Sequence, residues 1–214
     1  MELLVATRSI HKMSEIRGIL KGVPHLRVID LCEAGISYHA TEDDLEIFDT
    51  YEENALSKVK YFQDIVGIPT VADDSGIEVD ALSRAPGVRS KRFSLNRELK
   101  GEDRDFSNNA YLLEQLGDKP MKERTARYVC VAALDFGTGG EVTVIRGEAD
   151  GLIAMKPVGQ GGFGYDPLFF DPSLNRTFGE ISPEDKCARS HRGKAFRAVA
   201  EHINNIVNTD DNRV

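Results

Sequence analysis

The sequence has few of the features that mark secreted or membrane-spanning proteins. It holds three cysteines in 214 residues, and no two of them form a Cys-x-x-Cys pair. That scarcity argues against a disulfide framework or a zinc site and fits a reducing cytoplasm. No apolar run approaches the roughly 20 residues that cross a bilayer, and the first residues lack the basic start, apolar stretch and cleavage site of a signal peptide. We therefore expect a cytoplasmic protein with no membrane partner.

Positive charge is also in deficit. The chain carries 27 Lys and Arg against 35 Asp and Glu, a formal net charge of −8 at pH 7. A surface of that sign repels nucleic-acid backbones, so we expect no nucleic-acid partner, although a cleft can still attract a small anion. The hydrophobic share of 41% is that of an ordinary folded domain. The length suits a single domain, residues 1–214, with a frayed tail at 209–214.

The hydrophobic pattern predicts an α/β fold with a mixed sheet. A short apolar run at 3–7 is typical of a buried strand, and from Ile10 onward apolar residues recur at helical spacing. A strand, a brief turn and a helix form the opening of an α/β unit. The same reasoning predicts strands at 26–30, 70–72, 77–81, 126–134 and 141–146, helices at 51–66, 108–116 and from about 190, and loops at 33–50 and 94–104.

Residues 7–12 follow the first predicted strand and open its helix. Backbone N–H groups at a helix start are unpaired and carry a partial positive charge that suits phosphate. Thr7 and Ser9 add hydroxyl donors, and Arg8 and Lys12 add full positive charges. This segment is a candidate phosphate-binding turn; the alternative is that Ser9 only caps the helix.

A pair of acids, Asp73 and Asp74, ends a predicted strand and precedes Ser75 and Gly76. Adjacent carboxylates beside buried apolar residues repel each other unless a cation lies with them. Oxygen ligands favour a hard ion such as Mg²⁺. Because side chains alternate along a strand, the two carboxylates should point to opposite faces, and only one should reach the metal. The alternative is a solvated turn.

The helix predicted at 51–66 carries Asn54 and Lys58 four residues apart, on one face. That face could present an amide and an ammonium to a cleft. Taken alone, the pair is better interpreted as part of a solvated helix face.

Glycine is concentrated at residues 159–167, which read GQGGFGYDP. Glycines allow the backbone to approach a ligand closely. Phe163 would offer a flat face on which a base stacks, and Asp166 would accept a hydrogen bond from a ring N–H. The alternative is a flexible surface loop.

Further donors gather near the start of the last predicted helix, at Lys186 and at Ser190-His191-Arg192. Arg192 offers a rigid fork for a carbonyl oxygen, and His191 can donate from a ring nitrogen. The alternative is that Ser190 caps the helix and Arg192 is solvated.

Together these segments resemble the inosine triphosphate pyrophosphatase family. The matching blocks are Ala6-Thr7…Lys12, Glu53-Asn54-Ala55…Lys58, Ala72-Asp73-Asp74-Ser75-Gly76, Ala85-Pro86-Gly87-Val88, Gly161-Gly162-Phe163-Gly164-Tyr165-Asp166-Pro167 and Lys186…Ser190-His191-Arg192. They span nearly the whole chain. The resemblance implies an elongated, two-lobed α/β fold around a central mixed sheet with flanking helices, an active-site cleft between the lobes, and a homodimer.

The resemblance also implies a reaction, the hydrolysis of ITP, dITP or XTP to the nucleoside monophosphate and pyrophosphate, which cleanses the nucleotide pool. Asp74 would be catalytic and would bind Mg²⁺ together with Glu46. The implied substrate-binding residues are Thr7, Arg8, Ser9, Ile10, His11, Lys12, Lys58, Ser75, Phe163, Gly164, Tyr165, Asp166, Lys186, His191 and Arg192. In this scheme Lys12 and Lys58 neutralise the leaving oxygens, and donors from His191 and Arg192 meet the 6-oxo group that adenine lacks.

The chain departs from the family pattern in two places. Ser9 stands where Asn is usual, so one amide contact to phosphate is missing. Arg8 stands where Gly is common, and its positive charge could partly compensate. Glu46 is found by counting back from residue 53 without a gap, in a segment that lacks the usual Glu-Thr-Gly pattern. Its rivals as metal ligand are Glu42, Asp43 and Asp44. Two other functions stay open: a pyrophosphatase for another modified nucleotide, and a nucleotide-binding protein without catalysis.

Overall fold

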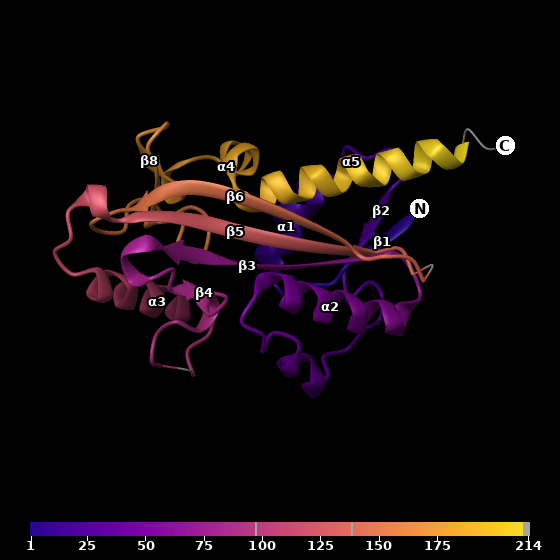
Figure 1. Ribbon diagram of the computed structural model, residues 1–214, viewed down its shortest axis with the longest axis horizontal. Helices are drawn as coiled ribbons and strands as arrows, with labels where there is room; N and C mark the ends of the chain where they lie inside the picture. The colour runs from indigo at the N-terminus through magenta and orange to yellow at the C-terminus, as the bar shows by residue number, and fades with distance from the viewer. Residues whose placement is uncertain (97, 138, 212–214) are drawn as a thin grey trace. The chain divides into compact units, whose positions relative to one another are not determined.

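The computed structural model describes residues 1–96, 98–137 and 139–211, with side chains described up to residue 206 (Figure 1). Its helices are α1 (Ile10–Leu20), α2 (Tyr51–Val66), α3 (Gly101–Leu116), α4 (Pro183–Arg189) and α5 (His191–Asp211). Its strands are β1 (Glu2–Val5), β2 (Arg27–Ile29), β3 (Thr70–Val79), β4 (Pro86–Gly87), β5 (Thr125–Asp135), β6 (Thr143–Ile153), β7 (Phe169–Asp171) and β8 (Arg176–Thr177). No helix among the described residues is both long enough and apolar enough to cross a membrane.

The strands form one mixed sheet in the order β2-β1-β3-β5-β6-β7-β8, with β4 paired to β3. β1 runs parallel to β2 and β3, whereas β3–β4, β6–β7 and β7–β8 are antiparallel. Helices flank this sheet, and Figure 1 shows α2 and α5 on opposite sides of the strands. The predicted α/β class with a mixed sheet is confirmed.

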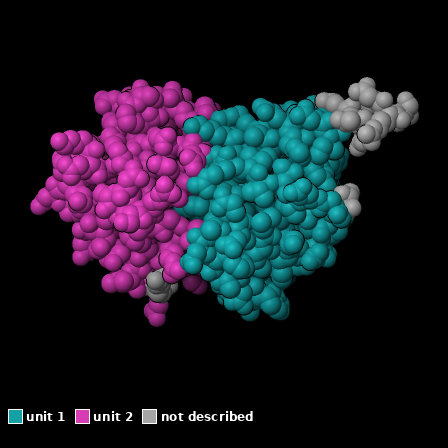
Figure 2. Space-filling model, in the orientation of Figure 1, with its two compact units in different colours: residues 1–74, 130–147, 192–214 teal, residues 75–129, 148–191 magenta. Residues whose placement is uncertain are grey.

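The chain divides into two compact units (Figure 2). Unit 1 comprises residues 1–74, 130–147 and 192–214, and unit 2 comprises residues 75–129 and 148–191. The chain passes from one unit to the other within β3, β5 and β6, so both units are assembled from separate stretches of sequence.

The core of unit 1 joins α1 and α5 to the sheet. The predicted helical period of α1 is confirmed for Met13, Ile16 and Leu20, which are buried, whereas Ile10 is 85% exposed. These side chains pack with apolar residues of β1, β3 and β5 and with buried residues of α5, among them Phe196 and Val199. Burial of this face, rather than intrinsic helix propensity, is what stabilises such helices.

The core of unit 2 joins α3 to the sheet through Leu112 and Leu116, which pack with apolar side chains of β3, β5, β6 and β7. Arg124 is 1% exposed in this unit, and its guanidinium donates to the carbonyl oxygens of Gly117, Lys119 and Ala154. Carbonyls at a helix C-terminus have no partner within the helix, so this buried cation completes the end of α3.

Several predicted boundaries are wrong. The strands expected at 70–72 and 77–81 are one strand, β3, and α3 begins at Gly101, inside the segment expected to be a loop. The elements α4, β7 and β8 were not predicted, because each is too short to show a period. Of the expected frayed tail, residues 209–211 continue α5 and residues 212–214 lie outside the described residues.

Candidate active site

The acid pair lies inside β3 rather than in a turn after it. Asp73 is 2% exposed and Asp74 is 5% exposed, so the solvated-turn alternative is wrong. As the alternation of a strand requires, the two carboxylates contact different elements: Asp73 contacts side chains of α1 and α5, and Asp74 contacts α2.

Asp73 is the centre of a buried ion cluster in unit 1. Its Oδ2 accepts from Lys12 Nζ at 2.9 Å, lies 3.6 Å from Arg192 Nε, and accepts a long bond of 3.7 Å from Cys130 Sγ. Arg192 is 2% exposed and also pairs with Glu15 at 2.6 Å. The alternative in which Arg192 is solvated is therefore wrong.

The charges in this cluster fix its protonation. Burial raises the pKa of Asp73, but the nearby cations Lys12, Arg192 and Lys58 outweigh burial and hold that pKa well below the ordinary value. Burial lowers the pKa of Arg192, and the charges of Asp73 and Glu15 more than restore it. Asp73 is thus an anion at neutral pH, and the neighbouring cations compensate its charge.

The depressed pKa of Asp73 makes the stability of the protein sensitive to acid. A carboxyl with a lowered folded-state pKa adds stability above its unfolded pKa of about 3.9 and loses it as the pH falls through the folded value. We expect the difference in unfolding free energy between wild type and Asp73→Asn to shrink steadily as the pH is lowered below about 4. Urea titrations of both proteins between pH 7 and pH 2 measure this difference, and a constant difference would contradict the assignment.

Asp74 has a different environment on the other face of β3. Its Oδ2 accepts from Asn54 Nδ2 at 2.9 Å. Burial raises the pKa of Asp74, and the negative charge of Glu46 adds to this; together they exceed the opposing effects of Lys58, Lys12 and the bond from Asn54. A carboxylate with a raised pKa is a stronger base than an ordinary surface carboxylate.

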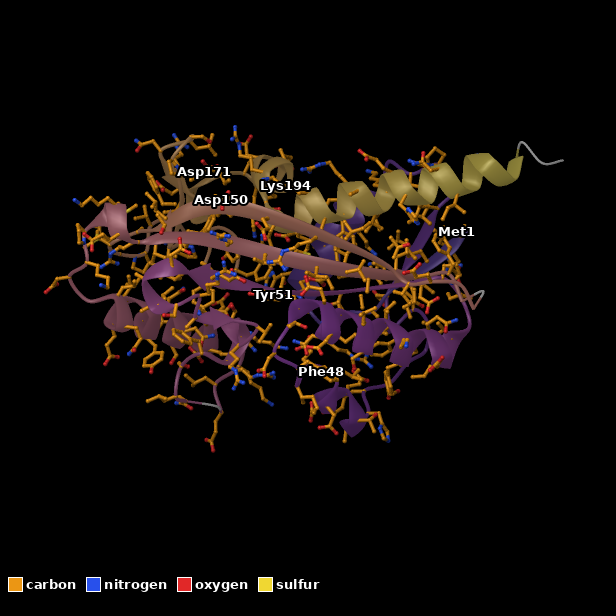
Figure 3. All side chains as sticks on the ribbon, in the orientation of Figure 1. Met1, Phe48, Tyr51, Asp150, Asp171 and Lys194 are labelled. Atoms are coloured by element: carbon orange, nitrogen blue, oxygen red, sulfur yellow. The ribbon has the colours of Figure 1, made fainter. Side chains whose placement is uncertain are left out.

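Asn54 and Lys58 are buried, at 1% and 8% exposure, so the solvated-face interpretation of α2 is wrong. The Asn54 side chain also bonds both backbone groups of Phe48, at 3.0 and 3.3 Å, and so ties the segment before α2 to the helix. Figure 3 labels Phe48 in that segment. Lys58 Nζ pairs with Glu46 Oε1 at 2.6 Å and donates to the carbonyl oxygen of Asp73.

The rivals of Glu46 have other environments. Glu42 is paired with Arg8 through two bonds of 2.7 and 2.9 Å, and Asp43 and Asp44 are exposed. Glu46, by contrast, lies close enough to Asp74 to raise its pKa. Among the described residues no group of three His, Cys, Asp or Glu side chains forms a ready-made metal cluster. Metal binding by Glu46 and Asp74 therefore stays a prediction.

The predicted phosphate-binding turn lies between β1 and α1. Ser9 caps α1, its Oγ accepting from Lys12 N at 3.3 Å, and Thr7 Oγ1 accepts from Ser9 N at 3.2 Å. Arg8 also donates to the carbonyl oxygen of Ile36 at 3.0 Å and so holds the loop that follows β2. A cavity of about 480 Å³ in unit 1 is lined by Thr7, Arg8, Ser9, Ile10, Met13, Ser14, Arg17, Asp30, Leu31 and Cys32. His11 is exposed, and the capping role of Ser9 is confirmed.

In unit 2 the glycine-rich loop is organised around the buried carboxylate of Asp166, which is 2% exposed. Oδ2 accepts from Phe163 N at 2.8 Å and from Lys186 Nζ at 2.5 Å, and Oδ1 accepts from Tyr128 Oη at 3.2 Å. Gly162 has φ +74°, and a Cβ at that position would lie 2.1 Å from Asp166 Oδ2. The loop is therefore closely packed, and the flexible-loop alternative is wrong.

The remaining loop residues are tied to their surroundings. The Tyr165 hydroxyl donates to the Ser90 carbonyl oxygen at 2.8 Å, and burial raises the pKa of Tyr165. Gly164 N donates to Asp105 Oδ2 at 2.9 Å. Substrate contacts by Gly164, Tyr165 and the half-buried Ser75 stay predictions.

Two aromatic contacts complete this cluster. The Lys186 ammonium lies 4.5 Å from the centre of the Phe163 ring, so a base that stacks on Phe163 would use the opposite face. His191 is 4% exposed and stacks on Tyr128, with 4.5 Å between ring centroids and 10° between planes. The sequence does not distinguish Tyr128 or Glu15, because their partners Asp166 and Arg192 are distant in sequence. The one local signal is that Glu15 lies three residues after Lys12, a spacing that puts both side chains on one helix face.

Known proteins share this arrangement of sequence and fold. The model of the Ham1 family matches residues 3–202. The chain is 42% identical over 200 residues to a dITP/XTP pyrophosphatase of Exiguobacterium sibiricum, covering 93% of this chain and 95% of that protein. It is similar to the solved structure of a HAM1 protein from Coxiella burnetii, with a TM-score of 0.80, 32% identity, and coverage of 95% and 98%. A solved dITP/XTP pyrophosphatase from Mycobacterium abscessus gives a TM-score of 0.70, 39% identity, and coverage of 93% and 97%. The predicted resemblance is confirmed, and the chain belongs to the Ham1 family.

Proposed function

We propose that the chain hydrolyses purine nucleoside triphosphates with non-standard bases, namely ITP, dITP and XTP, to the nucleoside monophosphate and pyrophosphate. Relatives at about 40% identity over nearly the full length carry the name dITP/XTP pyrophosphatase. The observation that carries the proposal is the buried cluster of unit 1, in which Lys12 and Lys58 lie with Asp73, Asp74 and Glu46.

A triphosphate presents several negative charges, and cleavage adds charge to the leaving pyrophosphate. Catalysis of this reaction is therefore mostly positioning and charge stabilisation. We assign the binding of phosphate oxygens to Lys12 and to the backbone N–H groups at the start of α1, where unpaired donors favour an anion. Because Arg8 pairs with Glu42, we assign Arg8 mainly to holding this turn in shape. Its positive charge beside the turn is a lesser contribution.

The cofactor we propose is Mg²⁺. Glu46 and Asp74 would supply carboxylate oxygens, which a hard divalent ion prefers. The negative charge of Glu46 raises the pKa of Asp74, and a bound cation would offset that repulsion. When bound, such an ion offsets negative charge on the phosphate oxygens. Lys58 already pairs with Glu46, so this ammonium limits the repulsion between the two acids.

Asp74 is our candidate for the residue that orients and deprotonates the attacking water. Water oxygen bonds to the α-phosphorus, the bond to the bridging oxygen of the pyrophosphate breaks, and the proton of the water passes to the base. Burial raises the pKa of the Asp74 carboxyl and so favours this transfer. Asn54 holds the carboxylate through a buried bond and keeps it in one orientation.

Base recognition is assigned to the cluster of unit 2. Phe163 offers a ring face for stacking, and Lys186 and His191 offer donors for an oxo group. A site that satisfies a 6-oxo group with donors leaves the 6-amino group of adenine facing donors, which costs binding. The donor role predicted for Arg192 stays a prediction, since in unit 1 its guanidinium contacts Glu15 and Asp73.

The test is release of pyrophosphate from ITP, XTP, dUTP, GTP and ATP by the purified chain, with Mg²⁺ and with a chelator in its place. We expect ITP and XTP to be cleaved at least about a hundredfold faster than ATP, as hydrogen-bond discrimination allows, and the chelator to abolish cleavage. Preferred cleavage of dUTP would instead support an enzyme for another modified nucleotide. Binding of ITP without cleavage would support a nucleotide-binding protein, in which Ser9 marks the loss of catalysis. On the family resemblance alone we also propose that the protein is cytoplasmic and forms a homodimer. Light scattering can test the oligomeric state.

A further inference from the structure

We propose that Tyr128 is a positioning residue for base selection, holding the carboxylate of Asp166 and the imidazole of His191 in one fixed arrangement. The inference rests on the proposed function, because it assigns a task to the base-recognition cluster of unit 2. Tyr128 lies in β5, and neither its spacing nor any motif in the sequence distinguished it.

Two contacts by different parts of one side chain carry the proposal. The Tyr128 ring stacks face to face on His191, with 4.5 Å between centroids. The Tyr128 hydroxyl donates to Asp166 Oδ1 at 3.2 Å. The other carboxylate oxygen, Oδ2, accepts from Phe163 N and Lys186 Nζ. One residue therefore contacts both the carboxylate that organises the glycine-rich loop and the imidazole at the start of α5.

Tyr128 is itself held in place by the core of unit 2. It is 7% exposed, and its ring lies 4.5 Å from the ring of Phe169 and 6.1 Å from that of Phe178. A side chain fixed on several sides by packing transmits that rigidity to the groups it contacts. Packing alone needs only the ring, so the hydroxyl is the part of Tyr128 that serves Asp166.

Fixing Asp166 matters because three donors converge on it. Phe163 N and Lys186 both bond Oδ2, so rotation of the carboxylate would move the Phe163 backbone and the Lys186 ammonium together. The bond from Tyr128 opposes that rotation. The expected role is thus in binding and selecting the base, not in cleaving the phosphate bond.

The test compares Tyr128→Phe, which removes the hydroxyl and keeps the ring, with Tyr111→Phe as the matched control. Tyr111 lies in the same unit, its ring contacts Phe93, and it has no part in the Asp166 cluster. We expect Tyr128→Phe to raise KM for ITP about fivefold, the scale of one lost hydrogen bond of typical net strength. It should leave kcat within about twofold and lower the preference for ITP over ATP. Tyr111→Phe should match wild type.

Equilibrium binding of IMP without metal separates this inference from the proposed function. Calorimetry should show IMP affinity reduced about fivefold in Tyr128→Phe and no further reduction when Tyr128→Phe is added to Asp166→Asn, because the hydroxyl acts through that carboxylate. If wild type cleaves ITP but Tyr128→Phe binds IMP as tightly as wild type does, the inference falls and the proposed function stands. If wild type releases no pyrophosphate from ITP, the proposed function falls.

Discussion

Replacing Asp74 by Asn is expected to lower kcat for pyrophosphate release from ITP by about a thousandfold, in the middle of the range for loss of a general base. The amide has nearly the same shape as the carboxylate and can still bond Asn54, but it cannot accept the proton of the attacking water. At saturating Mg²⁺, KM should change less than kcat, since Asp74 is proposed to act on the water and the metal ion and not on the base.

The control for this variant is Asp64→Asn. Asp64 is an exposed acid of α2, so the substitution removes the same charge from the same unit without touching the buried cluster. Its kcat should equal that of wild type. Thermal unfolding of all three proteins shows whether Asp74→Asn remains folded; a folded Asp74→Asn protein with near-normal release would refute the catalytic assignment.

Replacing Asp73 by Asn is expected to destabilise the protein by about 3–5 kcal/mol, the cost of breaking a buried ion pair from one side. The substitution leaves the buried guanidinium of Arg192 and the ammonium of Lys12 without the anion that both contact. Urea unfolding at pH 7 measures the loss through the shift in midpoint at constant slope.

The matched comparison is Asp30→Asn. Asp30 pairs with Arg17 at 3.1 Å, and the two side chains are 26% and 40% exposed. An ion pair that water still reaches contributes about 0–1 kcal/mol, so this variant should lose far less stability than Asp73→Asn. Equal losses in the two variants would mean that the Asp73 cluster contributes no more than a surface pair.

The sequence was informative where chemistry is local and uninformative where it depends on distant partners. The turn at residues 7–12 was predicted with its cap because a helix start is a local event. Asn54 and Lys58 were assigned to the correct helix, but their burial could not be foreseen, since spacing identifies a shared face and not what that face contacts.

Long-range contacts account for most of what was missed. Arg192 was predicted to lie in the site, yet its ion pair with Glu15 joins residues 177 positions apart and leaves no periodic trace. In the sequence Tyr128 is an ordinary aromatic residue of a buried strand, and only the fold brings its hydroxyl to Asp166. Asp166 was itself predicted to accept from a ring N–H, whereas its described bonds organise the loop and hold Lys186.

The interleaving of the chain within β3, β5 and β6 also bears on its synthesis. Unit 1 includes residues 192 onward, so a growing polypeptide cannot complete that unit until α5 has emerged from the ribosome. Until then the apolar faces of β1 and α1, which pack against Phe196 and Val199 in the folded protein, stay exposed to water. Such nascent intermediates are prone to aggregate, so chaperone demand during translation should be greatest just before α5 appears.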